Sequence, residues 1–301
     1  MDDYSENWIT TNNKRIKIIN KNTQILDYNI LKKIGKGTFS DVFKVSNDKN
    51  IKTMKVYKTS YKKWGIIEKD ILIKLQPCVF FCKISDNFII NNHLFLILDY
   101  YDIDLYKYYI DYENINFDFK YIINSLLNGL SFLEDNELVH SDLKPENILL
   151  KLDNNKIKKI VICDFSLTLS IDKIKTNLNI VSLWYRPPEI YLNGKYNYKL
   201  DIWSMGCILY ELITLKPLFN AKSNDNNNIQ NMNLLKVHSN VLGNPSNEII
   251  QQFNNFIKIT HNDNIIINEN INRYLRYYLS WKPEDRLSAK ELLLIDLPIF
   301  I

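Results

Sequence analysis

Glycine is scarce in this chain, since only 7 of its 301 residues are glycine. Average usage of about 7% would give roughly 20 glycines in a chain of this length. The shortage excludes a collagen-like or glycine-rich chain, and a count of 8 prolines excludes a proline-rich one. Because glycine adopts backbone conformations that other residues avoid, the positions that keep it are informative.

Cysteine is also rare, and the four cysteines are Cys78, Cys82, Cys163 and Cys207. Only the first two lie close together, and no group of histidines accompanies them, so the pattern does not indicate a zinc site. The polar N-terminal segment has no apolar stretch of the kind found in signal peptides. We therefore expect free thiols in a reducing, intracellular compartment, either the cytoplasm or the nucleus.

Long apolar runs and a strong net charge are absent too. No stretch of about 18 apolar residues occurs, which predicts no membrane-spanning segment. The 38 basic and 34 acidic residues leave a net charge of +4 without a dense Lys/Arg run, so we expect no nucleic-acid partner. The chain is instead 46% hydrophobic, with 19 tyrosines and 14 phenylalanines. This is enough apolar material for a large core in one domain or two lobes.

Strand patterns come first along the chain and helical patterns follow, which predicts an α+β fold with two lobes. Residues 1–27 are polar and are interpreted as an N-terminal extension, and the asparagine-rich residues 220–233 as an insertion. Short runs rich in Ile, Val, Phe and Tyr predict strands, and apolar residues at helical spacing predict helices. The predicted strands are 28–34, 41–45, 52–57 and 93–98, and the predicted helices are 63–75, 121–136 and 201–215.

Two of the seven glycines, Gly35 and Gly37, lie between the first two predicted strands. Small residues there allow backbone amides to approach a polyphosphate, and Val42 follows at a position where it would cover a base. An ordinary hairpin turn explains the same loop, because the third position of the pattern is Ser40. No Walker A lysine and no helix follow, which excludes a P-loop and a Rossmann turn.

Lys55 lies in the next strand, and Glu68 lies on the inner face of the helix that follows it. A buried ammonium group needs an anionic partner, so these two residues are expected to pair and to direct Lys55 toward nucleotide phosphates. A solvated surface pair is the alternative interpretation of these two residues taken alone.

The strongest pattern is VHSDLKPENILL, residues 139–150. Phosphoryl transfer needs an acceptor for a hydroxyl proton, a cation near the phosphate and ligands for Mg²⁺. Asp142, Lys144 and Asn147 offer these three groups in that order. Asp164 follows a predicted strand and would add a carboxylate for the same hard cation.

From these residues onward the chain resembles the eukaryotic protein kinases, most closely the cyclin-dependent branch of the CMGC group. The resemblance covers residues 28–301 and includes Pro-Pro-Glu189, Asp201-Ile-Trp-Ser-Met-Gly206 and Arg286, which is similar to the arginine that pairs with Glu189. It implies a bilobal fold with a small β-rich N-lobe at about 28–98, a hinge at about 99–104 and a helical C-lobe at about 105–301.

The resemblance also implies ATP and Mg²⁺ as cofactors. Asp142, Lys144, Lys55 and Glu68 are the implied catalytic residues, and Asn147 and Asp164 the implied metal ligands. The implied ATP-binding residues are Ile34, Gly35, Lys36, Gly37, Thr38, Phe39, Ser40, Val42, Thr53, Lys55, Asp99, Tyr101 and Leu149.

The chain departs from the family pattern at several positions. Ser141 replaces the arginine of the His-Arg-Asp motif, and Ser166 replaces the glycine of the Asp-Phe-Gly motif. Asn177 lies near the family's activation-loop phosphosite, with Thr176 beside it, so we expect activity without that phosphate. The segment KKWGII before Glu68 does not resemble PSTAIRE, so a cyclin is not implied and the regulatory subunit stays unknown.

The implied activity is transfer of the ATP γ-phosphoryl group to Ser/Thr hydroxyls of protein substrates. Arg186 of the Trp-Tyr-Arg segment is expected to bond a backbone carbonyl near Val181, as in the cyclin-dependent branch. Because a substrate amide would then lack an acceptor, a proline after the phosphoacceptor is predicted to be preferred. A nucleotide-binding pseudokinase scaffold is the alternative, and a kinase of small molecules is a third possibility.

Overall fold

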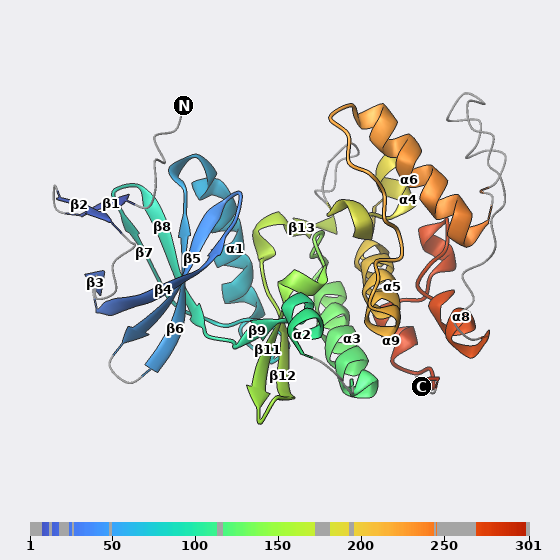
Figure 1. Ribbon diagram of the computed structural model, residues 1–301, viewed down its shortest axis with the longest axis horizontal. Helices are drawn as coiled ribbons and strands as arrows, with labels where there is room; N and C mark the ends of the chain where they lie inside the picture. The colour runs from blue at the N-terminus through green and yellow to red at the C-terminus, as the bar shows by residue number, and fades with distance from the viewer. Residues whose placement is uncertain are drawn as a thin grey trace. The chain divides into compact units, whose positions relative to one another are not determined.

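The computed structural model describes most of the chain, which divides into two compact units (Figure 1). The first unit consists of Met1–Asp102 with Cys163–Leu167, and the second of Ile103–Ile162 with Thr168–Ile301. The described residues are 8–11, 14–17, 24–25, 27–47, 50–112, 117–171, 181–192, 196–243, 245 and 269–298.

The first unit is built on a six-stranded antiparallel sheet in the order β3-β4-β5-β6-β8-β7. One face carries a core of buried side chains in which Ile30, Phe43, Val45, Met54 and Ile97 are almost fully inaccessible. The strands of this sheet are β3 (Gln24–Ile25), β4 (Tyr28–Lys36), β5 (Ser40–Asn47), β6 (Asn50–Tyr57), β7 (Ile84–Ile90) and β8 (His93–Asp99). The predicted strands in this part of the chain are confirmed, and β3 and β7 were missed.

Two further strands precede this sheet, within the segment that the sequence analysis interpreted as a polar extension. β1 (Trp8–Thr11) and β2 (Lys14–Lys17) pair with each other in an antiparallel hairpin. Apolar residues do not recur there at a regular spacing, which is why no strand was predicted.

Helix α1 (Lys62–Leu75) follows the short 3₁₀ turn η1 (Thr59–Tyr61) and packs on the sheet of the first unit (Figure 1). Its buried residues are Gly65, Glu68, Leu72 and Leu75, which recur at helical spacing. Gly65 permits a close approach, because a Cβ atom there would lie only 2.5 Å from the ring of Tyr57. One of the scarce glycines therefore sets the distance between the helix that carries Glu68 and the strand that carries Lys55.

The second unit is mainly helical. Its helices are α2 (Leu105–Asp111), α3 (Phe119–Asp135), α4 (Pro188–Tyr191), α5 (Lys199–Thr214), α6 (Asn227–Leu242), α8 (Glu269–Leu275) and α9 (Ala289–Leu292). Its short strands are β9 (Ile103–Asp104), β10 (Leu138–Val139), β11 (Ile148–Asp153), β12 (Lys156–Ile162) and β13 (Leu169–Ser170), arranged as β12-β11-β9 and β10-β13. The predicted helices at 121–136 and 201–215 are confirmed as α3 and α5.

Helix α5 lies at the centre of the second unit, with every residue from Leu200 to Leu212 buried. A helix that is apolar on all sides must be enclosed by other elements. Gly206 again marks a close contact, because a Cβ atom there would lie 2.6 Å from the Cβ atom of Tyr278.

The asparagine-rich segment at 220–233 is only partly an insertion, because α6 begins at Asn227. The side chain of Asn226 caps this helix by accepting bonds from the amides of Asn228 (2.9 Å) and Ile229 (3.4 Å). Asparagine is favoured at the N-cap, so a composition that indicated a loop instead supplies a helix start.

Three of the cysteines are buried and Cys163 is half-buried, and all four are free thiols. Among the described residues, no helix is both long and apolar enough to cross a membrane.

His238 in α6 is fully buried among the rings of Trp203, Phe219 and Trp281. Its Nδ1 lies 2.8 Å from the hydroxyl of Tyr191, while its Nε2 has no hydrogen-bond partner. Burial, together with the charge of Arg286, lowers the pKa of His238 to about 3.

We expect acid to destabilise the second unit through His238. The unfolded chain binds a proton on this ring below about pH 6.5 and the folded chain does not, so stability falls as pH drops from about 6.5 toward 3. Urea unfolding of His238→Gln should therefore show less acid destabilisation than the wild type, by about 2 kcal/mol at pH 5. Equal pH dependence of the two proteins between pH 7 and pH 5 would contradict this expectation.

Candidate active site

In the first unit, Lys55 is the centre of a buried network of charges. Its Nζ lies 2.9 Å from Glu68 Oε2, 3.1 Å from Glu68 Oε1 and 2.9 Å from Asp164 Oδ1. Burial by itself would lower the pKa of Lys55, but the carboxylates of Asp164 and Glu68 outweigh it and hold that pKa well above its ordinary value. The expected Lys55–Glu68 ion pair is present, and it is buried and not a solvated surface pair.

Tyr57 is a member of this network that the sequence analysis missed. Its hydroxyl donates to Glu68 Oε2. Tyr57 is fully buried and lies two residues after Lys55 in β6. Burial and the negative charge of Glu68 raise the pKa of Tyr57 well above its ordinary value, so the hydroxyl stays a donor. Tyr57 therefore holds the second oxygen of the carboxylate that orients Lys55.

The glycine-containing loop joins β4 to β5 with the expected turn. The amide of Gly37 donates to the carbonyl of Ser40 (2.8 Å), and Gly35 is paired with Val42 across the strands. The ammonium of Lys58 donates to the carbonyls of Gly37 (3.2 Å) and Thr38 (2.8 Å), which restrains the tip of the loop. This contact had no sequence signal, because Lys58 lies outside the family motifs.

The ring of Phe39 at the loop tip packs against the start of α1. Its centroid lies 5.2 Å from the ring of Tyr61 and 5.8 Å from that of Trp64. Together with Ser40, which is 4% exposed, these contacts tie the loop to the body of the first unit.

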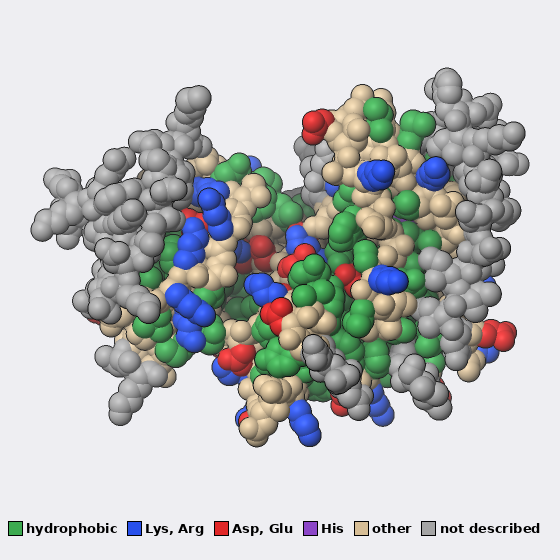
Figure 2. All heavy atoms as spheres, in the orientation of Figure 1, with side chains coloured by type: hydrophobic (Ala, Val, Ile, Leu, Met, Phe, Trp, Pro, Cys, Tyr) green, Lys and Arg blue, Asp and Glu red, His purple; other side chains and the backbone are tan. Residues whose placement is uncertain are grey.

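The sheet that carries this loop is rich in lysine. Figure 2 shows Lys and Arg side chains gathered over the sheet of the first unit on the face seen there. Strands β4 and β5 contribute Lys32, Lys33, Lys36 and Lys44. Such a concentration of positive charge favours a polyanionic ligand.

The remaining expected adenine-binding residues of the first unit lie on β4, β5 and β6, at the end of β8 and in the segment that follows it. Thr53 is paired with Leu98 across the sheet, and Asp99 donates its amide to the carbonyl of Lys83 (3.0 Å) while its carboxylate accepts from Lys52 (2.8 Å). Ile34, Val42 and Thr53 are half-buried, and Tyr101 is 8% exposed. Leu149 lies apart from these residues in the chain, in β11 of the second unit, and is also half-buried.

In the second unit, Asp142 receives four hydrogen bonds. Its Oδ1 accepts from the amide (3.1 Å) and the hydroxyl (2.7 Å) of Ser182, and its Oδ2 accepts from Lys144 (2.8 Å) and the side-chain amide of Asn147 (3.3 Å). Lys144 also donates to the hydroxyl of Ser182 (2.9 Å). The structure thus brings together the three predicted residues of this loop and adds Ser182, which the sequence analysis missed.

The backbone of this catalytic loop is anchored to α5 through Asp201. The Asp201 carboxylate accepts from the amides of His140 (2.6 Å) and Ser141 (3.0 Å). Burial raises the pKa of Asp201, although the nearby His140 and both amides oppose the rise. Ser141 itself is fully buried and donates its hydroxyl to the carbonyl of Val139 (3.2 Å). Thr176 and Asn177 lie outside the described residues.

The segment after the activation loop shows both contacts that were expected from the family resemblance. Arg186 donates from Nε (3.1 Å) and Nη2 (2.9 Å) to the carbonyl of Val181, which has a left-handed φ of 70°. Arg286 pairs with Glu189 through two bonds of 2.7 Å.

A pocket of about 550 Å³ adjoins the catalytic loop. Lys144 and Ser182, both bonded to Asp142, form part of its wall. Glu146, Trp184 and Lys222 are among the other residues that line it, and burial raises the pKa of Glu146. The pocket therefore lies beside the predicted catalytic residue Asp142.

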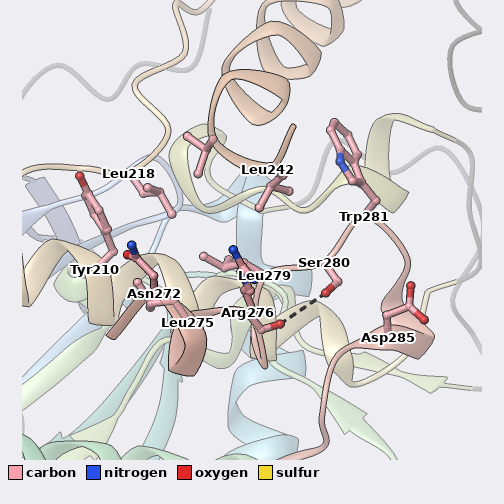
Figure 3. A pocket seen from close by; sticks show the side chains of 11 residues that line it. Tyr210, Leu218, Leu242, Asn272, Leu275, Arg276, Leu279, Ser280, Trp281 and Asp285 are labelled. Carbon is pink, nitrogen blue, oxygen red and sulfur yellow. Dashed lines mark hydrogen bonds between the residues drawn. The ribbon is translucent and has the colours of Figure 1, made fainter. Parts of the chain in front are cut away.

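A second cavity of the same unit, about 410 Å³, is lined by α5, α6 and α8 and by Trp281 (Figure 3). None of the predicted site residues contributes to its wall. The labelled residues include the apolar Leu242, Leu275 and Leu279, together with the exposed Arg276.

No cluster of three or more His, Cys, Asp or Glu side chains in the described parts of the chain could enclose a metal ion. The predicted ligands Asn147 and Asp164 lie in the second and first units, respectively. Mg²⁺ is commonly held by one or two carboxylates together with substrate phosphates, so the carboxylate of Asp164 has the chemistry that a ligand of a nucleotide-bound ion needs.

Comparison with known proteins agrees with this arrangement. Residues 28–296 match the model of the protein kinase domain family. Cyclin-dependent kinase E-1 of Arabidopsis thaliana is 33% identical over 223 residues, which are 66% of this chain and 47% of the plant protein. Probable cyclin-dependent kinase 8 of Dictyostelium discoideum is 32% identical over 224 residues, 66% of this chain and 57% of that protein.

A probable cell division protein kinase of Encephalitozoon cuniculi is 32% identical over 204 residues, which are 64% of this chain and 74% of that protein. The matched part of the chain thus spans about half the length of the first two relatives. The family match covers most of the chain and includes every predicted site residue. The chain therefore belongs to the protein kinase domain family and within it is related to the cyclin-dependent kinases of the CMGC group.

Proposed function

We propose that this chain is an ATP-dependent serine/threonine protein kinase with a preference for proline after the phosphoacceptor. Membership of the protein kinase family supports the general reaction. The observation that carries the proposal is the geometry of Asp142, whose two oxygens are held by four donors from three residues.

Asp142 orients the substrate hydroxyl and accepts its proton. A catalytic base must be held in a defined orientation, and the bonds from Ser182, Lys144 and Asn147 restrain the carboxylate. Lys144 also brings a positive charge to 2.8 Å from Asp142, where it can stabilise negative charge on the transferred phosphoryl group. Catalysis then depends on positioning and electrostatics, as phosphoryl transfer requires.

The first unit binds the nucleotide. Lys55, oriented by Glu68, contacts the α- and β-phosphates, and the loop from Gly35 to Ser40 covers them with backbone amides. Asp164 and Asn147 would hold Mg²⁺, which when bound neutralises negative charge on the phosphates.

Serine and threonine are the proposed acceptors because the loop Asp-Leu-Lys-Pro-Glu-Asn has the form found in serine/threonine kinases. The proline preference follows from Arg186, which occupies the carbonyl of Val181 with two donors. A substrate amide placed beside that carbonyl would lose its acceptor, whereas proline has no amide hydrogen. Trp184, 39% exposed at the wall of the adjoining pocket, offers an apolar surface for the proline ring.

The test is a set of peptides that differ only around the phosphoacceptor. With ATP and Mg²⁺, we expect phosphate incorporation into a Ser-Pro peptide, incorporation about tenfold lower in kcat/KM for the matched Ser-Ala peptide, and none into a Tyr-Pro peptide. The Arg186→Met protein should lose the difference between Pro and Ala, because it frees the Val181 carbonyl.

Each outcome has a separate meaning. Equal rates for Ser-Pro and Ser-Ala would contradict the proline preference alone. Nucleotide binding without transfer to any peptide or protein would identify the chain as a pseudokinase.

A further inference from the structure

Ser166 differs from the glycine that the family carries after Asp-Phe, and it forms a bond that glycine cannot form. Its hydroxyl donates to Asp164 Oδ1 at 2.7 Å. Ser166 itself is 2% exposed, whereas the side chain of Asp164 is 35% exposed, so the bond joins a buried donor to a carboxylate that a ligand can reach. A hydrogen bond from a buried hydroxyl to a carboxylate is of the stronger, charge-assisted kind.

The bond restrains a carboxylate whose backbone is in an unusual conformation. Asp164 has a φ of 64°, in the left-handed region that only a few per cent of residues other than glycine adopt, Asn and Asp more often than most. Ser166 lies two residues further on in the 3₁₀ turn η3 (Phe165–Leu167). The amide of Phe165 donates to Glu68 Oε1 (3.3 Å), which ties this turn to α1.

Two donors reach the same oxygen of Asp164 in this structure, because Lys55 Nζ also lies 2.9 Å from Oδ1. In the proposed function Lys55 contacts the phosphates of a bound nucleotide, so its bond to Asp164 is shared or lost at that stage. The hydroxyl of Ser166 has no such second role and keeps its place on the carboxylate.

We propose that Ser166 is a positioning residue that orients the Asp164 carboxylate for a nucleotide-bound Mg²⁺ ion. The inference rests on the proposed function, in which Asp164 is a metal ligand. Carboxylates that bind metals are usually oriented by hydrogen-bonding partners, and removal of such a partner typically costs about 10-fold to 100-fold in metal affinity. Here that partner is supplied by the residue that replaces glycine.

The experiment measures ADP binding by calorimetry, with Mg²⁺ and with EDTA, in the wild type and in Ser166→Ala. We expect Mg²⁺ to tighten ADP binding by the wild type, and the Mg²⁺ concentration for half of this gain to rise about tenfold in Ser166→Ala. Binding of ADP in EDTA should be equal in the two proteins, because the proposed role of the hydroxyl is exerted through the metal ion alone. Ser166→Thr, which keeps a hydroxyl, should retain the wild-type Mg²⁺ dependence.

Ser239→Ala is the matched control, since Ser239 is also buried but lies in α6 and its hydroxyl has no partner. It should leave the Mg²⁺ dependence unchanged. Urea unfolding of each variant separates a loss of metal affinity from a loss of the fold, and Ser166→Cys, with a similar size but a weak donor, replaces Ser166→Ala if that protein does not fold.

The inference and the proposed function fail in different ways. An unchanged or tighter Mg²⁺ dependence in folded Ser166→Ala would overturn the role of Ser166 and leave the proposed function intact. A wild-type protein whose ADP affinity is indifferent to Mg²⁺ would overturn both.

Discussion

Asp142→Asn should reduce phosphoryl transfer by about 10²-fold to 10⁴-fold and leave nucleotide binding almost unchanged. Asparagine cannot accept the proton of the substrate hydroxyl. Its NH₂ group would also face donors whichever way the amide turns, because Ser182 donates to one oxygen of Asp142, and Lys144 and Asn147 donate to the other. The variant therefore loses both the base and the arrangement that positions it.

The measurement compares kcat with a Ser-Pro peptide against ADP affinity in the same preparation. Asp153→Asn is the control, because Asp153 is exposed at the end of β11 and makes only a 3.9 Å ion pair with Lys158. It should keep the wild-type rate. Turnover by Asp142→Asn within a few-fold of the wild type would refute the assignment of Asp142 as the base.

Arg286→Leu is expected to destabilise the second unit by about 3–5 kcal/mol, the usual result of breaking a buried ion pair. The Arg286 side chain is fully buried, and all five of its donors are used. Two reach Glu189, two reach the carbonyl of Ser280 and one reaches that of Lys199, while the guanidinium lies 4.9 Å from the ring of Trp203. Its removal leaves the carboxylate of Glu189 buried without a counter-ion.

Urea unfolding, followed by the fluorescence of Trp203 and the other tryptophans, measures this effect. Arg273→Leu is the matched control, because Arg273 is exposed on α8 and makes one long contact of 3.5 Å. Addition of Glu189→Leu to Arg286→Leu should recover part of the lost stability, since no buried charge then remains. An unfolding midpoint of Arg286→Leu equal to that of the wild type would contradict the structural role of the pair.

Much of the fold was predictable because the relevant patterns are local. Strands β4, β5, β6 and β8 and helices α1, α3 and α5 carry regular apolar spacing, and the structure confirms each of them. Strand β7 was missed because its centre reads Ser-Asp-Asn and most of its side chains face solvent. The start of α6 was missed because asparagine indicates a loop by composition and a helix cap by position.

The candidate site was predictable where the family motifs carry it and not where distant segments meet. Asp142, Lys144 and Asn147 follow from a single run of sequence, and their mutual contacts are present. Tyr57 and Ser182 have no such signal, because their roles depend on bonds to Glu68 and Asp142, 11 and 40 residues away. A bond between side chains that far apart in sequence leaves no spacing pattern to detect.

Helix α5 determines how the catalytic loop is expected to unfold. The segment from His140 to Lys144 has no regular secondary structure, and irregular segments usually open first in local unfolding. Here, however, the amides of His140 and Ser141 are bonded to Asp201 on a helix enclosed on all sides. These bonds cannot break without exposing a buried carboxylate, so the loop opens cooperatively with the core of the unit and not as an independent surface segment.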